Sequence, residues 1–70
     1  MYKMLRFVNG NLQDSVESED YNYLREVMSK ESMEVVNSNK KSWSGLVLDK
    51  ADLVAFSGNS EYRWRIQSVV

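Results

Sequence analysis

The side chains that most often perform catalysis are missing from this 70-residue sequence, which contains no histidine and no cysteine. The commonest general base and the commonest thiol nucleophile are therefore absent, so Ser-His-Asp and Cys-His arrangements cannot form. Asp49 and Asp52 are the nearest candidates for a catalytic carboxylate pair. Because they flank Lys50 and Ala51, they are more typical of residues that cap and close a turn. We therefore expect no catalytic residues and no enzyme activity.

Motifs for metals and cofactors are missing as well. Classical structural metal sites use Cys or His ligands, and neither residue type occurs here. The three glycines are isolated from one another and fit no Gly-rich phosphate-binding loop. We therefore expect no metal site and no cofactor.

Two segments combine basic and aromatic side chains, as proteins that bind single-stranded nucleic acids do. They contain Lys40, Lys41 and Trp43 in NSNKKSWSG, and Arg63 and Arg65 in EYRWRIQSVV. In a strand, successive side chains point to opposite faces, so Tyr62, Trp64 and Ile66 share one face and the two arginines share the other. We expect the aromatic face to belong to the core or to a subunit interface, and Arg63 and Arg65 to form a bare basic stripe.

Trp43 is not constrained by this alternation because its segment reads as a loop. It either packs against the edge of the core or projects as an exposed anchor for a partner. Exposed tryptophan is a frequent hot-spot residue in protein interfaces. Trp43, with Lys40 and Lys41, is therefore a candidate for partner binding.

Charge is distributed unevenly along the chain, although the net charge is only −1. Seven of the ten acidic residues lie between Asp14 and Glu34, and most basic residues lie outside this range. Either these are solvated faces of a helix and a sheet, or they form two patches of opposite sign that steer partners. The acidic segment could meet a basic partner or imitate a nucleic-acid backbone.

The length of the chain indicates one domain spanning residues 1–70, near the lower limit for a self-sufficient core. No disulfide can stabilise it, so it needs a compact core, which the two Trp, four Tyr and two Phe could fill, or oligomerisation. We expect a homodimer. The absence of cysteine, of an uninterrupted apolar leader and of any apolar run near 20 residues favours a cytoplasmic protein with no membrane segment.

The first half of the sequence predicts a hairpin followed by a helix. Residues 2–8 have strand character, Asn9-Gly10 favours a type I′ turn, and residues 11–16 form a weaker return strand that is short, frayed or at an edge. Ser18 is the expected N-cap of a helix over residues 19–30. Its apolar face consists of Tyr21, Leu24, Val27 and Met28, and we expect this face to pack on a sheet.

The second half predicts four strands, near residues 33–36, 46–48, 53–56 and 62–69. Short links between them favour antiparallel neighbours. The expected fold is α+β with the order ββαββββ, a mainly antiparallel sheet and one amphipathic helix on one face. The second face of the sheet is then solvated, curled on itself or covered by another subunit.

This layout has a strand, Asn9-Gly10, a weak return strand, a Ser18-capped helix and a strand-rich tail containing LVLDKADLVAFS. It resembles the many small proteins encoded by phages and prophages of low-GC Gram-positive bacteria. The resemblance implies a cytoplasmic accessory protein that binds and alters a host factor.

Two functional hypotheses follow from these patterns. The first is a protein-interaction module, homodimeric and phage-encoded, that acts on a host protein by surface binding without catalysis. The alternative is a weak single-stranded nucleic-acid-binding protein. Both use the same candidate residues: Lys40, Lys41, Trp43, Arg63 and Arg65.

Overall fold

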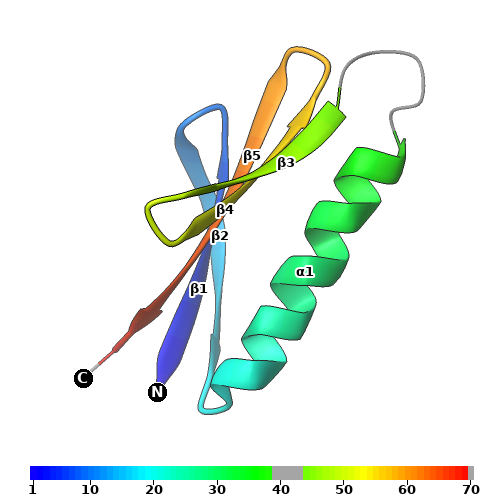
Figure 1. Cartoon of the computed structure of the whole chain (residues 1–70). Coiled ribbons are helices and arrows are strands. Elements are labelled where there is room, and N and C mark those ends of the chain that lie inside the picture. Colours follow the sequence, from blue (N-terminus) through cyan, green and yellow to red (C-terminus); the bar gives the residue numbers. More distant parts are fainter. Residues whose placement is uncertain (39–43, 70) are drawn as a thin grey trace.

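The computed structural model describes residues 1–38 and 44–69, which form one sheet and one helix (Figure 1). The elements are β1 (Tyr2–Val8), β2 (Asn11–Ser18), α1 (Tyr21–Ser38), β3 (Ser44–Asp49), β4 (Asp52–Ser57) and β5 (Ser60–Ser68). The sheet order is β2-β1-β5-β4-β3, and every neighbouring pair is antiparallel. The predicted α+β class, with one helix packed on one face of an antiparallel sheet, is confirmed.

The strand predicted at residues 33–36 is wrong, because α1 continues to Ser38. The described chain therefore has the order ββαβββ, with five strands instead of six. The adjacent β-branched residues Val35 and Val36 favour a strand locally. However, Leu24, Met28 and Val35 also recur at helical spacing, and all three belong to the core or pack against it. Tertiary packing therefore decides between the two structures.

The N-terminus of α1 is capped by Asp20 and not by Ser18, which corrects the predicted cap. The Asp20 Oδ1 atom accepts hydrogen bonds from the backbone N–H groups of Asn22, at 3.0 Å, and Tyr23, at 3.2 Å. Ser18 acts one step earlier, accepting a hydrogen bond from the Asp20 N–H at 3.0 Å. Asp20 also places a negative charge at the positive end of the helix dipole.

Within the described residues, no helix is long and apolar enough to span a membrane.

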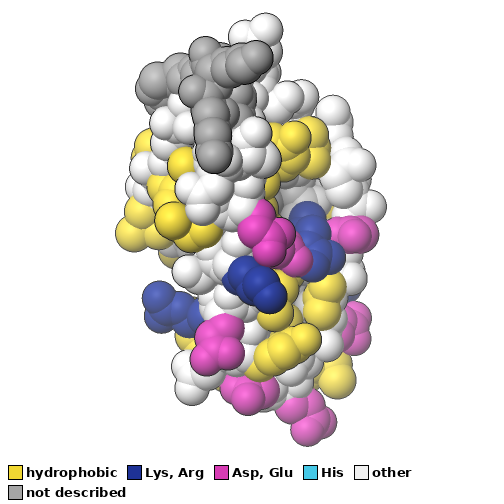
Figure 2. Space-filling model, turned by 90° about the vertical axis from the view of Figure 1, so that its right-hand side faces the viewer, with side chains coloured by type: hydrophobic (Ala, Val, Ile, Leu, Met, Phe, Trp, Pro, Cys, Tyr) yellow, Lys and Arg dark blue, Asp and Glu magenta, His cyan; other side chains and the backbone are white. Residues whose placement is uncertain are grey.

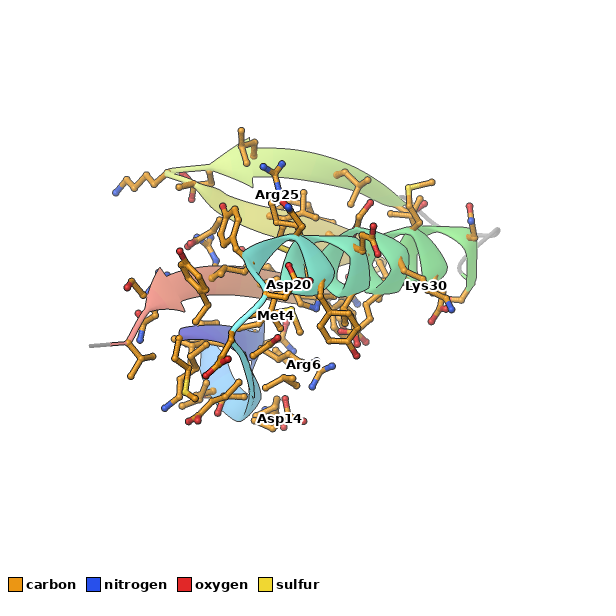
Figure 3. The ribbon with its side chains drawn as sticks, turned by 90° about the horizontal axis from the view of Figure 1, so that it is seen from below. Met4, Arg6, Asp14, Asp20, Arg25 and Lys30 are labelled. Carbon is orange, nitrogen blue, oxygen red and sulfur yellow. The ribbon has the colours of Figure 1, made fainter. Side chains whose placement is uncertain are left out.

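The core lies between α1 and the sheet. Its buried members are Met4, Leu24, Ala55 and Trp64, contributed by β1, α1, β4 and β5. Tyr62 and Ile66 pack against this cluster on the same face as Trp64, which confirms the predicted alternation along β5. Met4 pairs with Ile66 across the central strands, and Figure 3 labels Met4 beneath the helix.

The face of the sheet opposite α1 is not covered by any helix or strand of the described chain (Figure 1). We call it the open face. By register, it carries Phe7 of β1, Val47 of β3, Val54 of β4 and Arg63 and Arg65 of β5. The two outer strands, β2 and β3, form the edges of the sheet.

Candidate interaction sites

A groove runs between the second half of α1 and the β1–β2 hairpin, with a volume of about 480 Å³. We call it the α1–hairpin groove. It is lined by Arg6, Phe7, Val8, Gln13, Asp14, Glu31, Glu34, Val35, Ser38, Tyr62 and Trp64. Most of its exposed lining is apolar, and two of its polar side chains, Asp14 and Glu31, converge on Arg6. Apolar concavities with a few convergent polar groups are the usual form of a binding site.

Arg6 and Glu31 form the polar centre of this groove. Arg6 donates two hydrogen bonds to Glu31, from Nε to Oε1 at 2.9 Å and from Nη2 to Oε2 at 2.5 Å. It donates a third, from Nη1 to Asp14 Oδ1, at 3.2 Å. The Trp64 indole N–H donates to Glu31 Oε1 at 3.0 Å. We call Arg6, Asp14, Glu31 and Trp64 the Glu31 cluster; it connects β1, β2, β5 and α1.

These contacts shift the protonation equilibria of the pair. The hydrogen bonds from Arg6 lower the pKa of Glu31 below its ordinary value of 4.5; partial burial opposes this shift and Trp64 reinforces it. The hydrogen bond to Glu31 is also the largest cause of the raised pKa of Arg6. Both groups are therefore charged at neutral pH, and the positive charge of Arg6 is matched by two carboxylates.

The rim of the α1–hairpin groove is acidic. Its described lining residues include Asp14, Glu31 and Glu34, and Arg6 is the one basic residue among them. Glu34 is exposed and takes part in no ion pair within residues 1–38 and 44–69. Figure 3 shows Arg6 and Asp14 together on this flank of the helix, and Figure 2 shows acidic side chains among hydrophobic ones over its right-hand part. The unpaired charge that remains in the groove is negative.

A second concavity, of about 460 Å³, lies on the opposite flank of α1. Arg25 is its one charged lining residue, and Figure 3 shows Arg25 on the side of the helix that faces β3 and β4. Leu48 and Ala51 contribute from the β3–β4 hairpin. The two flanks of the helix therefore differ in charge, and the acidic one has the more apolar lining.

On the open face, Arg63 and Arg65 are held by carboxylates. Arg65 donates from Nε and Nη2 to the two oxygens of Asp52, both at 2.9 Å. Arg63 Nη1 donates to Asp52 at 3.0 Å and to Asp49 at 3.2 Å, and its Nη2 donates to Glu61 at 3.2 Å. We call these five residues the Asp52 cluster. The expected bare basic stripe is wrong, because three carboxylates lie against two arginines.

Asp52 is the centre of this cluster and is only 3% exposed. The hydrogen bonds from Arg65 are the largest cause of its lowered pKa, and those from Arg63 add to the shift, while burial opposes it. Arg65 also lies over the Phe7 ring, with its guanidinium carbon 5.4 Å from the ring centroid. Asp49 and Asp52 therefore both close the β3–β4 turn, as expected, and hold the arginines of β5.

Three of the candidate binding residues, Lys40, Lys41 and Trp43, lie outside the described residues. Ser38, at the end of α1, lines the α1–hairpin groove. The part these three residues play in partner binding remains a prediction. Among residues 1–38 and 44–69, no group of three or more acidic side chains is arranged to hold a metal ion.

The Glu31 cluster was not predicted, although the sequence contains two signals for it. Along β1, Tyr2, Met4 and Val8 share the helix-facing side, so Arg6 is a charge on a core face. Along α1, Glu31 follows Leu24, Val27 and Met28 on the apolar stripe. Two misplaced charges of opposite sign, on elements that pack together, indicate an ion pair.

A third feature is the exposed edge strand β3. Its residues Leu46, Val47 and Leu48 are 41%, 47% and 75% exposed. Leu46 and Leu48 face the α1 side and Val47 faces the open face. Figure 2 shows hydrophobic side chains gathered at the left-hand margin, on the β3 side of the molecule. Three consecutive exposed apolar residues on an unpaired edge are uncommon in a domain without a partner.

The fold and these surfaces define a small α+β domain with a groove beside its helix and one apolar sheet edge. The chain matches no protein-family model, no curated protein and no solved structure.

Proposed function

We propose that the protein is a non-catalytic protein-interaction module that binds a polypeptide segment of a partner in the α1–hairpin groove. The observation that carries the proposal is an apolar groove in which Arg6, the one cation among the described lining residues, already binds both Glu31 and Asp14. Glu34 remains on the rim as a carboxylate without an ion pair among the described residues. An apolar surface supplies affinity, and the leftover negative charge selects the partner.

The chemistry of the groove favours a segment with an apolar anchor beside a lysine or arginine. The anchor would pack against Val8, Val35 and Tyr62, which line the groove and are half-buried. The cation would approach Glu34, which forms no ion pair within residues 1–38 and 44–69. An acidic peptide would instead meet three carboxylates, so it should bind poorly.

The resemblance to phage and prophage proteins adds a biological expectation to this proposal. The partner would be a host protein in the cytoplasm, and binding would act by occupying one of its surfaces. The absence of His and Cys supports binding without catalysis.

A peptide-display selection on the immobilised protein tests the proposal. Selected peptides should be enriched in an apolar residue next to Lys or Arg. They should bind Glu34→Lys at least about tenfold more weakly than the wild type, the equivalent of about 1.4 kcal/mol. Glu26→Lys is the matched control, because Glu26 is an exposed glutamate of α1 that does not line the groove, and it should bind like the wild type. Equal binding by the two variants would show that the groove is not the site.

The nucleic-acid alternative receives less support from the geometry than from the sequence. Arg63 and Arg65 are neutralised by the Asp52 cluster, so they have little charge to offer phosphates. A gel-shift series across salt concentrations, with Lys40→Ala/Lys41→Ala and Arg63→Ala/Arg65→Ala variants, tests this alternative. Binding at low salt that is lost in both double variants would restore it, and no shift at low salt would remove it.

A further inference from the structure

Among the described residues, no strand pairs with the outer edge of β3, and the hydrogen-bonding groups of this edge can be assigned residue by residue. A two-residue hairpin turn closes on a hydrogen-bonded pair, here Asp49 and Asp52. Hydrogen-bonded and non-hydrogen-bonded pairs then alternate along the ladder. Val47 therefore bonds to Val54 of β4, whereas the N–H and C=O groups of Leu46 and Leu48 point away from the sheet. These outward groups are available to another strand.

The side chains of this edge are symmetric about Val47. The sequence Leu46-Val47-Leu48 reads the same in both directions. An antiparallel copy with its two-fold axis at Val47 sets Leu46 against Leu48 of the second copy and Val47 against Val47. The leucine pairs are then the hydrogen-bonded ones, which agrees with the outward direction of their backbone groups. Side-chain and backbone requirements select the same register.

Charge allows a second copy on β3 and opposes one on β2. Residues 44–48 carry no charge, and in this register Asp49 lies opposite Gly45, with Lys50 opposite Ser44. No like charges meet, and Asp49 is already paired with Arg63. The β2 edge carries Asp14 and Glu17 and no cation of its own, so a second copy there would place acid near acid.

We infer that two copies of this chain pair antiparallel through β3, with the two-fold axis at Val47. The product is one continuous sheet of ten strands, five from each copy, with both helices on the same face. Four leucines, Leu46 and Leu48 of each copy, form a ladder on the helix side, and the two valines meet on the open face. The α1–hairpin groove lies near the other edge of the sheet, so the dimer presents two grooves.

The pairing is tested first by mass. Only one strand from each copy takes part, so the interface is small and dimerisation depends on concentration. Light scattering across gel-filtration peaks should show the mass rising from 8.2 kDa toward twice that value. The useful range is from about 1 µM to about 1 mM, which spans weak association. A mass of one chain throughout this range would overturn the inference. The β3 edge would then be available only to a strand of another protein.

A charged substitution on each edge provides a matched comparison. Leu48→Lys should abolish the dimer, because it sets a cation opposite the apolar Leu46 of the second copy. The monomer should still fold, since the Leu48 side chain is 75% exposed. The control is Leu12→Lys on β2, where Leu12 is 58% exposed, and it should dimerise like the wild type. Loss of the dimer in both variants, or in neither, would contradict pairing through β3.

Cysteine cross-linking tests the register and does not depend on Leu48→Lys folding. The chain has no cysteine, so each introduced thiol is unique. Val47→Cys should form a disulfide-linked dimer, since the Cα atoms of a non-hydrogen-bonded pair lie about 4.5 Å apart, within disulfide reach. Leu46→Cys alone should not cross-link, because position 46 of the second copy lies diagonally across the strand pair, at about 7–8 Å. The reverse result would shift the axis to Leu46 and overturn the proposed register.

Discussion

The strands β2 and β3 are the two edges of one sheet, and they differ in charge, in the regularity of their register and in the number of apolar side chains they expose. β2 carries Asp14 and Glu17, and Gln13 forms a bulge, since Arg6 pairs with Asp14 and Phe7 with Leu12. β3 has no bulge in its register with β4 and exposes Leu46, Val47 and Leu48. Charges and bulges are the usual means by which proteins prevent edge-to-edge association. The contrast indicates that β2 is protected from pairing with another strand and that β3 is available for it.

The hairpins that carry these edges differ in their turns as well. Both turns have positive φ at their two central residues, with 51° and 84° at Asn9 and Gly10, and 52° and 70° at Lys50 and Ala51. Asn-Gly suits this type I′ geometry, whereas Lys-Ala does not. Asn9 is also bound to β5, because its Oδ1 accepts a hydrogen bond from the Glu61 N–H at 2.8 Å. The β3–β4 hairpin therefore depends more on the Asp52 cluster than on its turn.

The largest expected effect on stability comes from a substitution that removes the central carboxylate of the Asp52 cluster. Asp52→Ala should lower the free energy of unfolding by about 2–3 kcal/mol, because it removes charge-assisted hydrogen bonds from two arginines to a buried carboxylate. Asp14→Ala in the Glu31 cluster should cost at most about 1 kcal/mol, since its side chain is 59% exposed. Urea unfolding monitored by tryptophan fluorescence measures both. Similar losses of unfolding free energy would mean that Asp52 stabilises the β3–β4 hairpin no more than Asp14 stabilises the β1–β2 hairpin.

Acid should weaken both clusters. Glu31 and Asp52 have pKa values lowered below their ordinary 4.5 and 3.8, so the folded protein binds fewer protons than the unfolded chain in acid. Their contribution to stability is complete above about pH 4.5 and is lost as pH falls through the lowered values. Urea midpoints should therefore stay level from roughly pH 7 to pH 5 and fall below pH 4.5.

Neutral variants divide this acid dependence between the hairpins. Asp52→Asn and Glu31→Gln should each be less stable at neutral pH and lose less stability on acidification than the wild type. Asp14→Asn is the control, because Asp14 is an exposed partner of Arg6 in the same cluster. A wild-type acid slope in Asp52→Asn would show that the Asp52 cluster does not contribute to it.

Opposite substitutions in the two turns test the difference between them through smaller changes in the free energy of unfolding. Ala51→Gly should raise the free energy of unfolding by about 0.5–1 kcal/mol, since relief of a left-handed alanine exceeds the entropic cost of glycine. Gly10→Ala should lower it by about 1 kcal/mol; an added Cβ meets no heavy atom within 4 Å, so the cost lies in the backbone alone. Opposite signs in urea unfolding support the comparison, and equal signs contradict it.

Local signals were enough to predict most of the fold. Asn9-Gly10 marked the first hairpin, and alternation placed Trp64 on the helix face and the arginines of β5 on the other. Helix length was not predicted, because Val35 and Val36 have strand propensity and only their packing on the sheet decides in favour of a helix. The open face could be expected from the single helix, but which strands form the edges depends on long-range pairing.

The charged clusters were harder to predict, because their partners are distant in sequence. Arg6 and Glu31 are 25 residues apart, and Arg65 and Asp52 are 13 residues apart. The alternation that separates Arg65 from Trp64 is local, but it cannot reveal that a neighbouring strand brings Asp52 beside the arginine. Register across strands was needed to see that the basic stripe is neutralised.

The smallest expected effect on stability comes from a substitution that makes the β2 edge more apolar, and so more like the β3 edge. Glu17→Val should change the free energy of unfolding by less than about 0.5 kcal/mol, because the ion pair with Lys3 is exposed, with N and O atoms 3.7 Å apart. Light scattering should nevertheless detect species larger than two chains at high concentration, since both edges would then accept a strand. Glu26→Val, which adds the same side chain to the exposed side of α1, should leave the mass unchanged. If Glu17→Val also leaves the mass unchanged, the bulge at Gln13 is sufficient to keep β2 unpaired, and the difference between the edges lies in backbone geometry more than in charge.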